Sequence, residues 1–418
     1  MFVLSQNLKS ITSATLLVIA MFVTCAVRAQ DYTIVIKGGT VIDPKNNINE
    51  VMDVAIKDDK IVRVAKNIDA KGAQVVDAKG LYVTPGLIDI HSHNFYGTEE
   101  DHYLSNGYVA VAPDEFTFRS GVTTVADAGG AGWKSFNKFK EQTIDHADTR
   151  VFSFLNIVGE GMRGGAWEQN LSDMDAKATA TVAKAHKEVV GIKVAHYMGA
   201  EWEPVDRAVE AGKAANIPVM IDFGGNNPPL SIEDLFMKHL RPGDIFTHCF
   251  AQLSSREAIV DDQGKLKPFI VAAQQRGIIF DVGHGGGSFR FSQAIPALKA
   301  GFIPNTISTD LHTGSMNAGM KDQLNVMSKF LNMGMNVQQV MAASTWHAAK
   351  AIKHEELGNL SPGAEADVAV FSLKKGKFGF IDSGGFRMDG DQKLETELTI
   401  RAGKVMWDMN GISRPSWK

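Results

Sequence analysis

Eight short apolar runs alternate with helix-like segments through the middle of the sequence. The runs cover residues 87–91, 122–126, 151–156, 191–195, 218–222, 244–248, 278–282 and 306–310. Between them, segments such as 175–189 and 205–215 carry apolar residues at the spacing of a helix. Strands and helices in alternation are typical of βαβ units, and eight repeats predict an α/β fold with a closed (β/α)8 barrel.

The two ends of the chain have a different sequence pattern from the middle. Short alternating runs between residues 32 and 83 are separated by turn residues such as Gly38-Gly39 and Asp43-Pro44, and similar runs return at 366–371, 395–400 and 404–407. This pattern predicts a small β-sandwich formed by both ends, residues 30–84 and 359–418, beside a barrel of residues 85–358.

The amino terminus resembles a secretory signal. Lys9 precedes an apolar run at 14–23, and Val27-Arg28-Ala29 lies before the polar pair Gln30-Asp31. We expect a signal peptide over residues 1–29 and an exported protein, periplasmic or secreted. An uncleaved anchor and a lipoprotein modified at Cys25 are the lesser alternatives. Cleavage leaves Cys249 as the one cysteine, which excludes an intrachain disulfide.

Composition limits the partners. Hydrophobic residues make up 44% of the 418 residues and charged residues 22%, as in soluble globular proteins. A formal charge of −4 gives no electrostatic reason for nucleic-acid binding or for binding an anionic membrane. We therefore expect a small-molecule substrate and no membrane contact after signal cleavage. A homo-oligomer stays open, because methionines repeated over 316–341 suit either a core or an interface.

Potential metal ligands recur where the predicted strands end. His91 and His93 point the same way because side chains alternate along a strand. An isolated pair could equally be a chance polar end of a core strand, but other strand ends carry further polar side chains: Lys193, Asp222, His248, His284, Asp310 and His312. Imidazole and carboxylate groups meeting at a barrel mouth suit zinc or a similar divalent ion, which polarises a carbonyl and activates water.

Several motifs together resemble the amidohydrolase superfamily. They are PGLIDIHSH at 85–93, GIKV at 191–194, THC at 247–249 and STDLH at 308–312. GVTTV at 121–125, RPGD at 241–244 and FDVGHG at 280–285 further resemble its amidohydrolase/deacetylase branch, whose members are often labelled dihydroorotases. The likeness spans residues 32–407.

The resemblance implies a ligand set. His91, His93 and Asp310 would bind the more buried metal, and His248 the more exposed one. Lys193 would be carboxylated and bridge two zinc ions, which requires a neutral amine that burial favours. The alternative for Lys193 is an ordinary ion pair with Asp222 or Asp310.

One position departs from the family pattern. Relatives usually supply a histidine at the end of strand five, where this chain has Asp222. A carboxylate is an acceptable zinc ligand, so three alternatives stay open: Asp222 substitutes directly, it allows a different metal, or the centre holds one ion.

The expected function is metal-dependent hydrolysis of an amide or ester bond, of the deacylase or deacetylase type, in a small carboxylate-bearing substrate. Asp310 would accept the proton of the attacking water and pass it to the leaving group. Four residues are candidates for substrate binding: His284, Arg163, His312 and Tyr197. For His284 and Arg163 a structural turn and a solvated loop are the alternatives. The rival functions are a cyclic amidase of dihydroorotase type and a non-catalytic scaffold.

Overall fold

The computed structural model describes residues 32–222 and 229–417. By its contacts the chain divides into Met1–Asp31 and Tyr32–Lys418. The predicted signal peptide, residues 1–29, lies outside the described residues. Within them, no helix has both the length and the apolar character that crossing a membrane requires.

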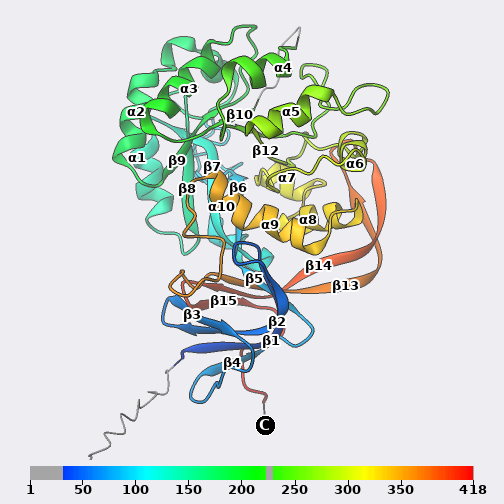
Figure 1. The fold of residues 1–418 in the computed structure, drawn as a ribbon. Helices are drawn as coiled ribbons and strands as arrows, with labels where there is room; N and C mark the ends of the chain where they lie inside the picture. Colours follow the sequence, from blue (N-terminus) through cyan, green and yellow to red (C-terminus); the bar gives the residue numbers. More distant parts are fainter. Residues whose placement is uncertain (1–31, 223–228, 418) are drawn as a thin grey trace, which may run out of the picture. The chain divides into compact units, whose positions relative to one another are not determined.

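A parallel sheet of seven strands forms the centre of the molecule (Figure 1). Each strand pairs with the next one along the chain, as βαβ units require. The first seven predicted runs are thereby confirmed as strands. Their bounds are β6 (Leu87–Ser92), β7 (Val122–Gly132), β8 (Arg150–Asn156), β9 (Val189–Val194), β10 (Val219–Ile221), β11 (Ile245–Phe246) and β12 (Ile279–Phe280).

The eighth predicted run, 306–310, takes its place without forming a regular strand. It touches both edges of the sheet through isolated parallel bridges, Asp281 with Thr306 and Ser92 with Leu311. Asp310 has a positive φ of 54°, which ends the extended backbone there. The prediction of eight strands is therefore confirmed in part, because the last run closes the ring by bridges and not by a ladder.

Helices cover the outside of this sheet (Figure 1). The Asp175 side chain caps the first long one by accepting hydrogen bonds from the next turn, as an N-cap residue should. The main helices are α2 (Ala176–Ala185), α3 (Glu203–Ala215), α5 (Pro268–Arg276), α6 (Phe291–Lys299), α8 (Gln323–Asn332), α9 (Val337–Ser344) and α10 (Trp346–Ala351). Shorter ones are η1 (Pro113–Glu115), η2 (Phe118–Ser120), α1 (Phe136–Phe139), η3 (Lys140–Ile144), η4 (Gly165–Gln169), η5 (Leu171–Asp173), α4 (Ile232–Asp234), η6 (Leu235–His239) and α7 (Thr313–Asn317).

The methionines that the sequence could assign either to a core or to an interface pack in the core of this barrel, as does the free cysteine. Met320, Met327 and Met341 are fully buried in the largest apolar cluster, so these methionines serve the core. Cys249 is buried in the same cluster as a free thiol.

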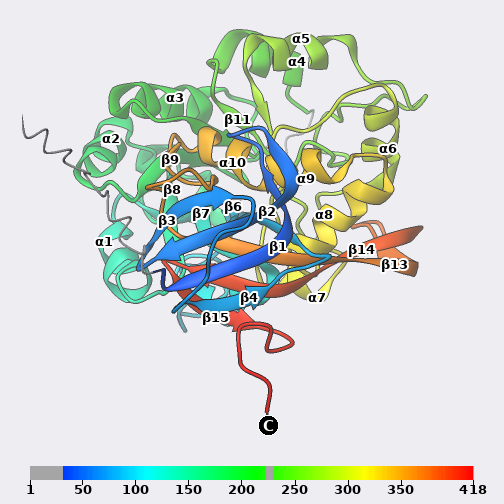
Figure 2. The ribbon, with the colours of Figure 1, turned by 60° about the horizontal axis from the view of Figure 1, so that its bottom comes forward.

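Strands from both chain ends pair in a single eight-stranded sheet (Figure 2). The ends meet where β5 runs antiparallel to β13. This pairing confirms in part the predicted sandwich of both ends. The strands are β1 (Ile34–Asp43), β2 (Ile48–Lys57), β3 (Lys60–Ala65), β4 (Gln74–Asp77), β5 (Tyr82–Pro85), β13 (Val368–Ile381), β14 (Arg387–Arg401) and β15 (Lys404–Asp408).

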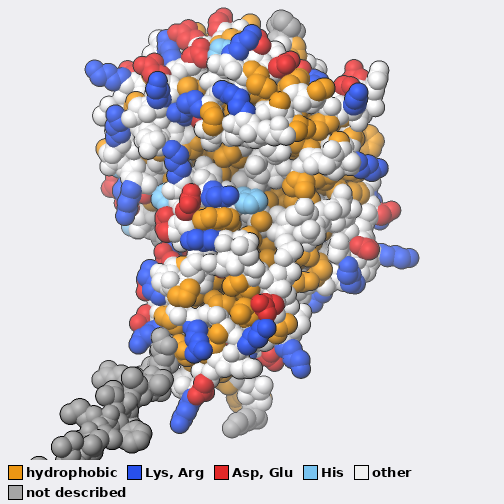
Figure 3. All heavy atoms as spheres, viewed as in Figure 1, with side chains coloured by type: hydrophobic (Ala, Val, Ile, Leu, Met, Phe, Trp, Pro, Cys, Tyr) orange, Lys and Arg blue, Asp and Glu red, His pale blue; other side chains and the backbone are white. Residues whose placement is uncertain are grey.

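The chain-end sheet contacts the barrel next to β6, the strand that carries His91. β5 continues through Gly86 into β6, and a Cβ on Gly86 would lie 2.3 Å from the Thr123 hydroxyl of β7. Arg150, at the start of β8, forms ion pairs of 2.7 Å with Glu365 and Asp367 just before β13. The start of β6 is thereby fixed by contacts from both ends of the sequence. On the face seen in Figure 3, charged side chains of both signs are interspersed.

Candidate metal centre

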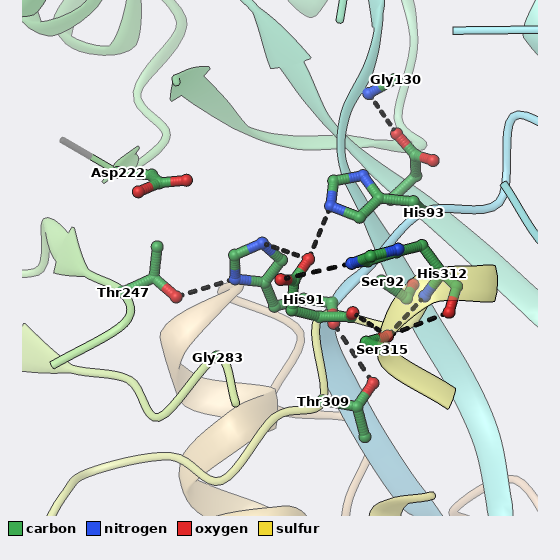
Figure 4. A network of polar contacts seen from close by, with 12 residues as sticks. His91, Ser92, His93, Gly130, Asp222, Thr247, Gly283, Thr309, His312 and Ser315 are labelled. Carbon is green, nitrogen blue, oxygen red and sulfur yellow. Dashed lines mark hydrogen bonds and ion pairs between the residues drawn. The ribbon is translucent and has the colours of Figure 1, made fainter. Parts of the chain in front are cut away.

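Three predicted ligands meet at the barrel mouth. His91 and His93 lie at the end of β6, and the ligand atoms of both and of Asp310 are all within 4.8 Å of one another. Asp310 Oδ1 lies 2.8 Å from His93 Nε2 and 3.5 Å from His91 Nε2. All three side chains are buried. Figure 4 shows the imidazoles of His91, His93 and His312 directed toward one another.

Residues 306–311, which close the ring and are called the closing segment below, pair with β6 through their backbone. This pairing sets the geometry of the cluster. The Asp310 N–H donates to the His91 carbonyl, and the His93 N–H donates to the Leu311 carbonyl. Asp89 of β6 also holds the closing segment, because its carboxylate accepts hydrogen bonds from the Thr309 N–H and hydroxyl. The carboxylate of Asp310 is therefore fixed over the two histidines by the backbone.

The hydrogen bonds of His91 define its tautomer. The Thr247 hydroxyl donates to Asp281 Oδ2 at 2.7 Å, so it must accept from His91 Nδ1, which lies 2.7 Å away. His91 Nε2 therefore carries a lone pair that faces Asp310. Burial and the nearby Lys193 lower the pKa of His91 to about 3, which keeps the ring neutral.

This donor set fits a divalent cation. The Nε2 atoms of His91 and His93 both face Asp310 Oδ1, so two ring nitrogens and one carboxylate oxygen converge on one buried point. Burial opposes ionisation of Asp310, yet the adjacent His91 imidazole and the hydrogen bond from His93 hold its pKa below the usual range. Two imidazoles and one carboxylate are a common ligand set of catalytic zinc.

Lys193 lies directly behind the three ligands on β9. Its side chain is fully buried, with Nζ 3.2 Å from His91 Nε2 and 3.9 Å from Asp222 Oδ2. Burial lowers the pKa of Lys193, which favours the neutral amine. Room for the side chain depends on Gly129 of β7, where an added Cβ would lie 2.7 Å from Lys193 Cγ.

Asp222 and His248 lie on another side of His91, apart from the three-ligand cluster. His248 Nε2 is 3.1 Å from Asp222 Oδ2, and the His248 and His91 rings are 4.8 Å apart. His248 Nδ1 is hydrogen-bonded to the Gly283 carbonyl. The structure thus gathers all six predicted ligands around one mouth, in two groups that share Lys193 as a neighbour.

Sequence reasoning missed Arg256. Its guanidinium is buried, lies 3.2 Å from Asp222 Oδ1, and donates to the Thr247 carbonyl at 2.6 Å. It also packs over the Phe246 ring at 4.6 Å. Arg256 comes from the loop after β11, away from any strand end or motif, so no signal in the sequence points to it.

Sequence reasoning also missed Glu168, which pairs with His196 just past the end of β9. His196 Nδ1 is 2.7 Å from the buried Glu168, and His196 Nε2 is 3.9 Å from Asp222 Oδ2. Burial alone would lower the pKa of His196, but the Glu168 carboxylate raises it to about 9. A second cation, an imidazolium, therefore faces Asp222 at neutral pH.

Of the four predicted substrate-binding residues, His312 lies close to Asp310, whereas Tyr197 follows β9. His312 Nε2 is 4.0 Å from Asp310 Oδ2, and its Nδ1 caps α7 by accepting from the Gly314 N–H. Tyr197 lies three residues past β9, but its hydroxyl donates to Glu201 at 2.9 Å and not to the cluster.

The other two make contacts elsewhere. His284 is buried, with Nε2 2.7 Å from Lys329 Nζ and Nδ1 2.9 Å from the Gly285 carbonyl. Arg163 packs on the Trp167 ring at 3.8 Å and lines a cavity of about 440 Å³ together with Tyr103. His284 therefore supports the wall of the mouth, whereas Arg163 is open to a cavity beside it.

Comparison with known proteins identifies the family. The model of the amidohydrolase family matches residues 291–406. A protein named "Deacetylase" from Brucella anthropi is 33% identical over 338 residues, which cover 79% of this chain and 81% of that protein.

Two solved structures share the fold. A crystal structure of an adenine deaminase has a TM-score of 0.80 at 29% identity, covering 90% of this chain and 100% of that one. A crystal structure of a dihydroorotase has a TM-score of 0.79 at 28% identity, covering 90% and 99%. The chain therefore belongs to the amidohydrolase superfamily and is a hydrolase that acts on C–N bonds.

Proposed function

We propose that this protein is a metal-dependent deacylase that hydrolyses an amide or ester bond in a small carboxylate-bearing substrate. The observation that carries the proposal is the buried cluster of His91, His93 and Asp310, whose two imidazoles and one carboxylate suit a divalent ion. The relative named "Deacetylase" supports acyl removal. The proposal includes a closed (β/α)8 barrel, with the chain ends forming a β-sandwich beside it.

A zinc ion held by His91, His93 and Asp310 would supply Lewis acidity and lower the pKa of water to near neutrality. The protein's own part is proton transfer. Asp310 uses Oδ1 toward the two histidines, which leaves Oδ2 to accept the proton of the attacking water and deliver it to the leaving group. His312, 4.0 Å from Oδ2, lies where it can orient that oxygen.

Lys193 is proposed to react with carbon dioxide. Its neutral amine forms a C–N bond to the carbon of CO₂ while one C=O π bond gives its electron pair to oxygen, and the nitrogen releases one proton to water, giving an anionic carbamate. The neutral amine that this step needs is favoured by burial. The product would add a negative group beside His91, where a metal cation would be stabilised.

Substrate recognition is proposed for the cavity beside the mouth. Arg163 and Tyr103 line it, and the loops that carry them follow β6 and β8. A guanidinium is well suited to pair with a carboxylate. We propose that Arg163 binds the carboxylate of the substrate, while the acyl group enters the mouth. Export of the protein, carried by residues 1–29, is part of the same proposal.

A substrate panel tests this function. Zinc-loaded protein would be assayed with N-acyl amino acids, carboxylate-bearing esters and dihydroorotate, with Asp310→Asn as the control for contaminating activity. Hydrolysis of N-acyl amino acids or esters, lost in the variant, supports the proposal. Turnover of dihydroorotate instead would favour the cyclic amidase. No bound metal and no turnover of any compound would favour the scaffold.

A further inference from the structure

Asp222 is enclosed by groups that are positive or can carry positive charge. Arg256 Nη1 lies 3.2 Å from one of its oxygens, and the other oxygen lies 3.1 Å from His248, 3.9 Å from Lys193 and 3.9 Å from His196. The Arg256 and Asp222 side chains are only 2% and 7% exposed, so water screens this pair little.

Arg256 is held in place by more than its ion pair. It donates to the Thr247 carbonyl at 2.6 Å and packs over the Phe246 ring. Thr247 is the residue whose hydroxyl fixes the tautomer of His91. The guanidinium is therefore fixed against Asp222 and the end of β11, and it cannot lose its charge at any physiological pH.

A second divalent ion would bring too much positive charge into this mouth. Arg256 Nη1 already lies 3.2 Å from Asp222 Oδ1, and both side chains are almost fully buried. A divalent ion bound to Asp222 beside the guanidinium would place three positive charges against one buried carboxylate. Burying unpaired charge is strongly unfavourable.

We infer that Arg256 takes the place of a second metal ion. The protein then holds one divalent ion at His91, His93 and Asp310, and the Arg256 guanidinium neutralises Asp222. Asp222 is then a positioning residue and not a metal ligand. The inference rests on the proposed metal-dependent function and decides the number of ions that the site takes.

Metal counting tests the inference. The protein would be stripped with a chelator, reloaded with Mn²⁺, passed through a desalting column and analysed for bound metal. We expect about one ion per chain in the wild type and in Arg256→Lys, and about two in Arg256→Met, where Asp222 is released. Electron paramagnetic resonance adds an independent readout, because two neighbouring Mn²⁺ ions couple magnetically and a single ion does not.

Matched variants keep the test decisive. Arg256→Met removes the guanidinium partner of a buried carboxylate, which lowers stability, so the double change Asp222→His with Arg256→Met is measured as well, and it too should take about two ions. Arg207→Met, which removes an arginine paired with Glu203 on α3, should keep about one ion. Asp222→Asn should also keep the count of the wild type.

Two coupled ions in the wild type would overturn the inference, as would a single ion in both folded variants that lack Arg256. Either result leaves the metal-dependent function standing. Absence of any bound ion from every variant would instead contradict the proposed function itself.

Discussion

At the scale of single residues, Asp310 combines backbone and side-chain roles. Its positive φ ends the closing segment, its N–H is bound to the His91 carbonyl, and its carboxylate contacts both histidines. Asparagine tolerates positive φ and keeps the size of the side chain, but it cannot take up a proton.

Replacing Asp310 by Asn should therefore lower kcat by about 10²- to 10⁴-fold, the usual contribution of a general acid–base group, or more if the ion is also lost. The folded structure should persist, as judged by circular dichroism and the unfolding transition. Turnover close to that of the wild type would show that another group moves the proton.

Lys329 gives a prediction about pH. It is fully buried, donates to the Gly319 carbonyl at 2.6 Å and contacts His284, and burial lowers its pKa to about 7. In the unfolded chain a lysine titrates near 10.4. Between these two values the unfolded state binds more protons than the folded state, so this lysine makes the free energy of unfolding rise with pH.

Lys329→Met removes that contribution. The difference in unfolding free energy between wild type and variant should shift in favour of the wild type as the pH is raised from about 7 to about 10. Urea unfolding at several pH values measures it. A difference that stays constant over this range would show that Lys329 keeps its ordinary pKa in the fold.

The sequence predicts the candidate ligands that meet at the mouth better than it predicts their neighbours. The six candidates could be found because each lies at or just past the end of a run that is visible in the apolar pattern. Arg256, Glu168 and Lys329 could not, because a loop arginine, a short 3₁₀ turn and an amphipathic helix bring them to the site only after the chain has folded.

At the scale of elements, the strands differ more in length than their patterns suggest. β11 and β12 have only two residues each, although apolar runs of five surround them. The backbone turns early: His248 has a φ of 54° and Gly283 a φ of 44°. Runs of apolar residues predict that a segment is buried, but the turn that places a ligand can shorten the strand without changing the pattern.

β7 shows how one strand makes room for another's side chain. Gly129 has a φ of 96° and lies against Lys193, so Gly129→Ala adds both backbone strain and a contact at 2.7 Å. We expect a loss of about 1–3 kcal/mol of stability together with a fall in kcat/KM. Gly72→Ala is the matched control, since Gly72 also has a positive φ but has no atom within 4 Å of the added Cβ.

The control should lose stability and keep catalysis. Thermal unfolding and kcat/KM of both variants separate the two effects. Unchanged kcat/KM in Gly129→Ala would show that the position of Lys193 is not critical for turnover.

At the scale of the whole molecule, the fold brings distant parts of the sequence to one mouth. His91 and Asp310 are 219 residues apart and share a hydrogen bond between their backbones. The chain-end sheet fixes the start of β6, and the closing segment fixes its end. A ligand that bridges such distant segments stabilises the whole fold, because it binds the folded chain and not the unfolded one.

The most direct test of the central claim is the melting temperature of chelator-stripped protein with and without added zinc, measured for the wild type and for His91→Asn. For the wild type we predict a clear rise with zinc, corresponding to about 2.7 kcal/mol when free zinc is 100 times its Kd, and little rise for the variant. Equal melting with and without zinc in the wild type, or an equal rise in the variant, would contradict a metal centre at His91, His93 and Asp310.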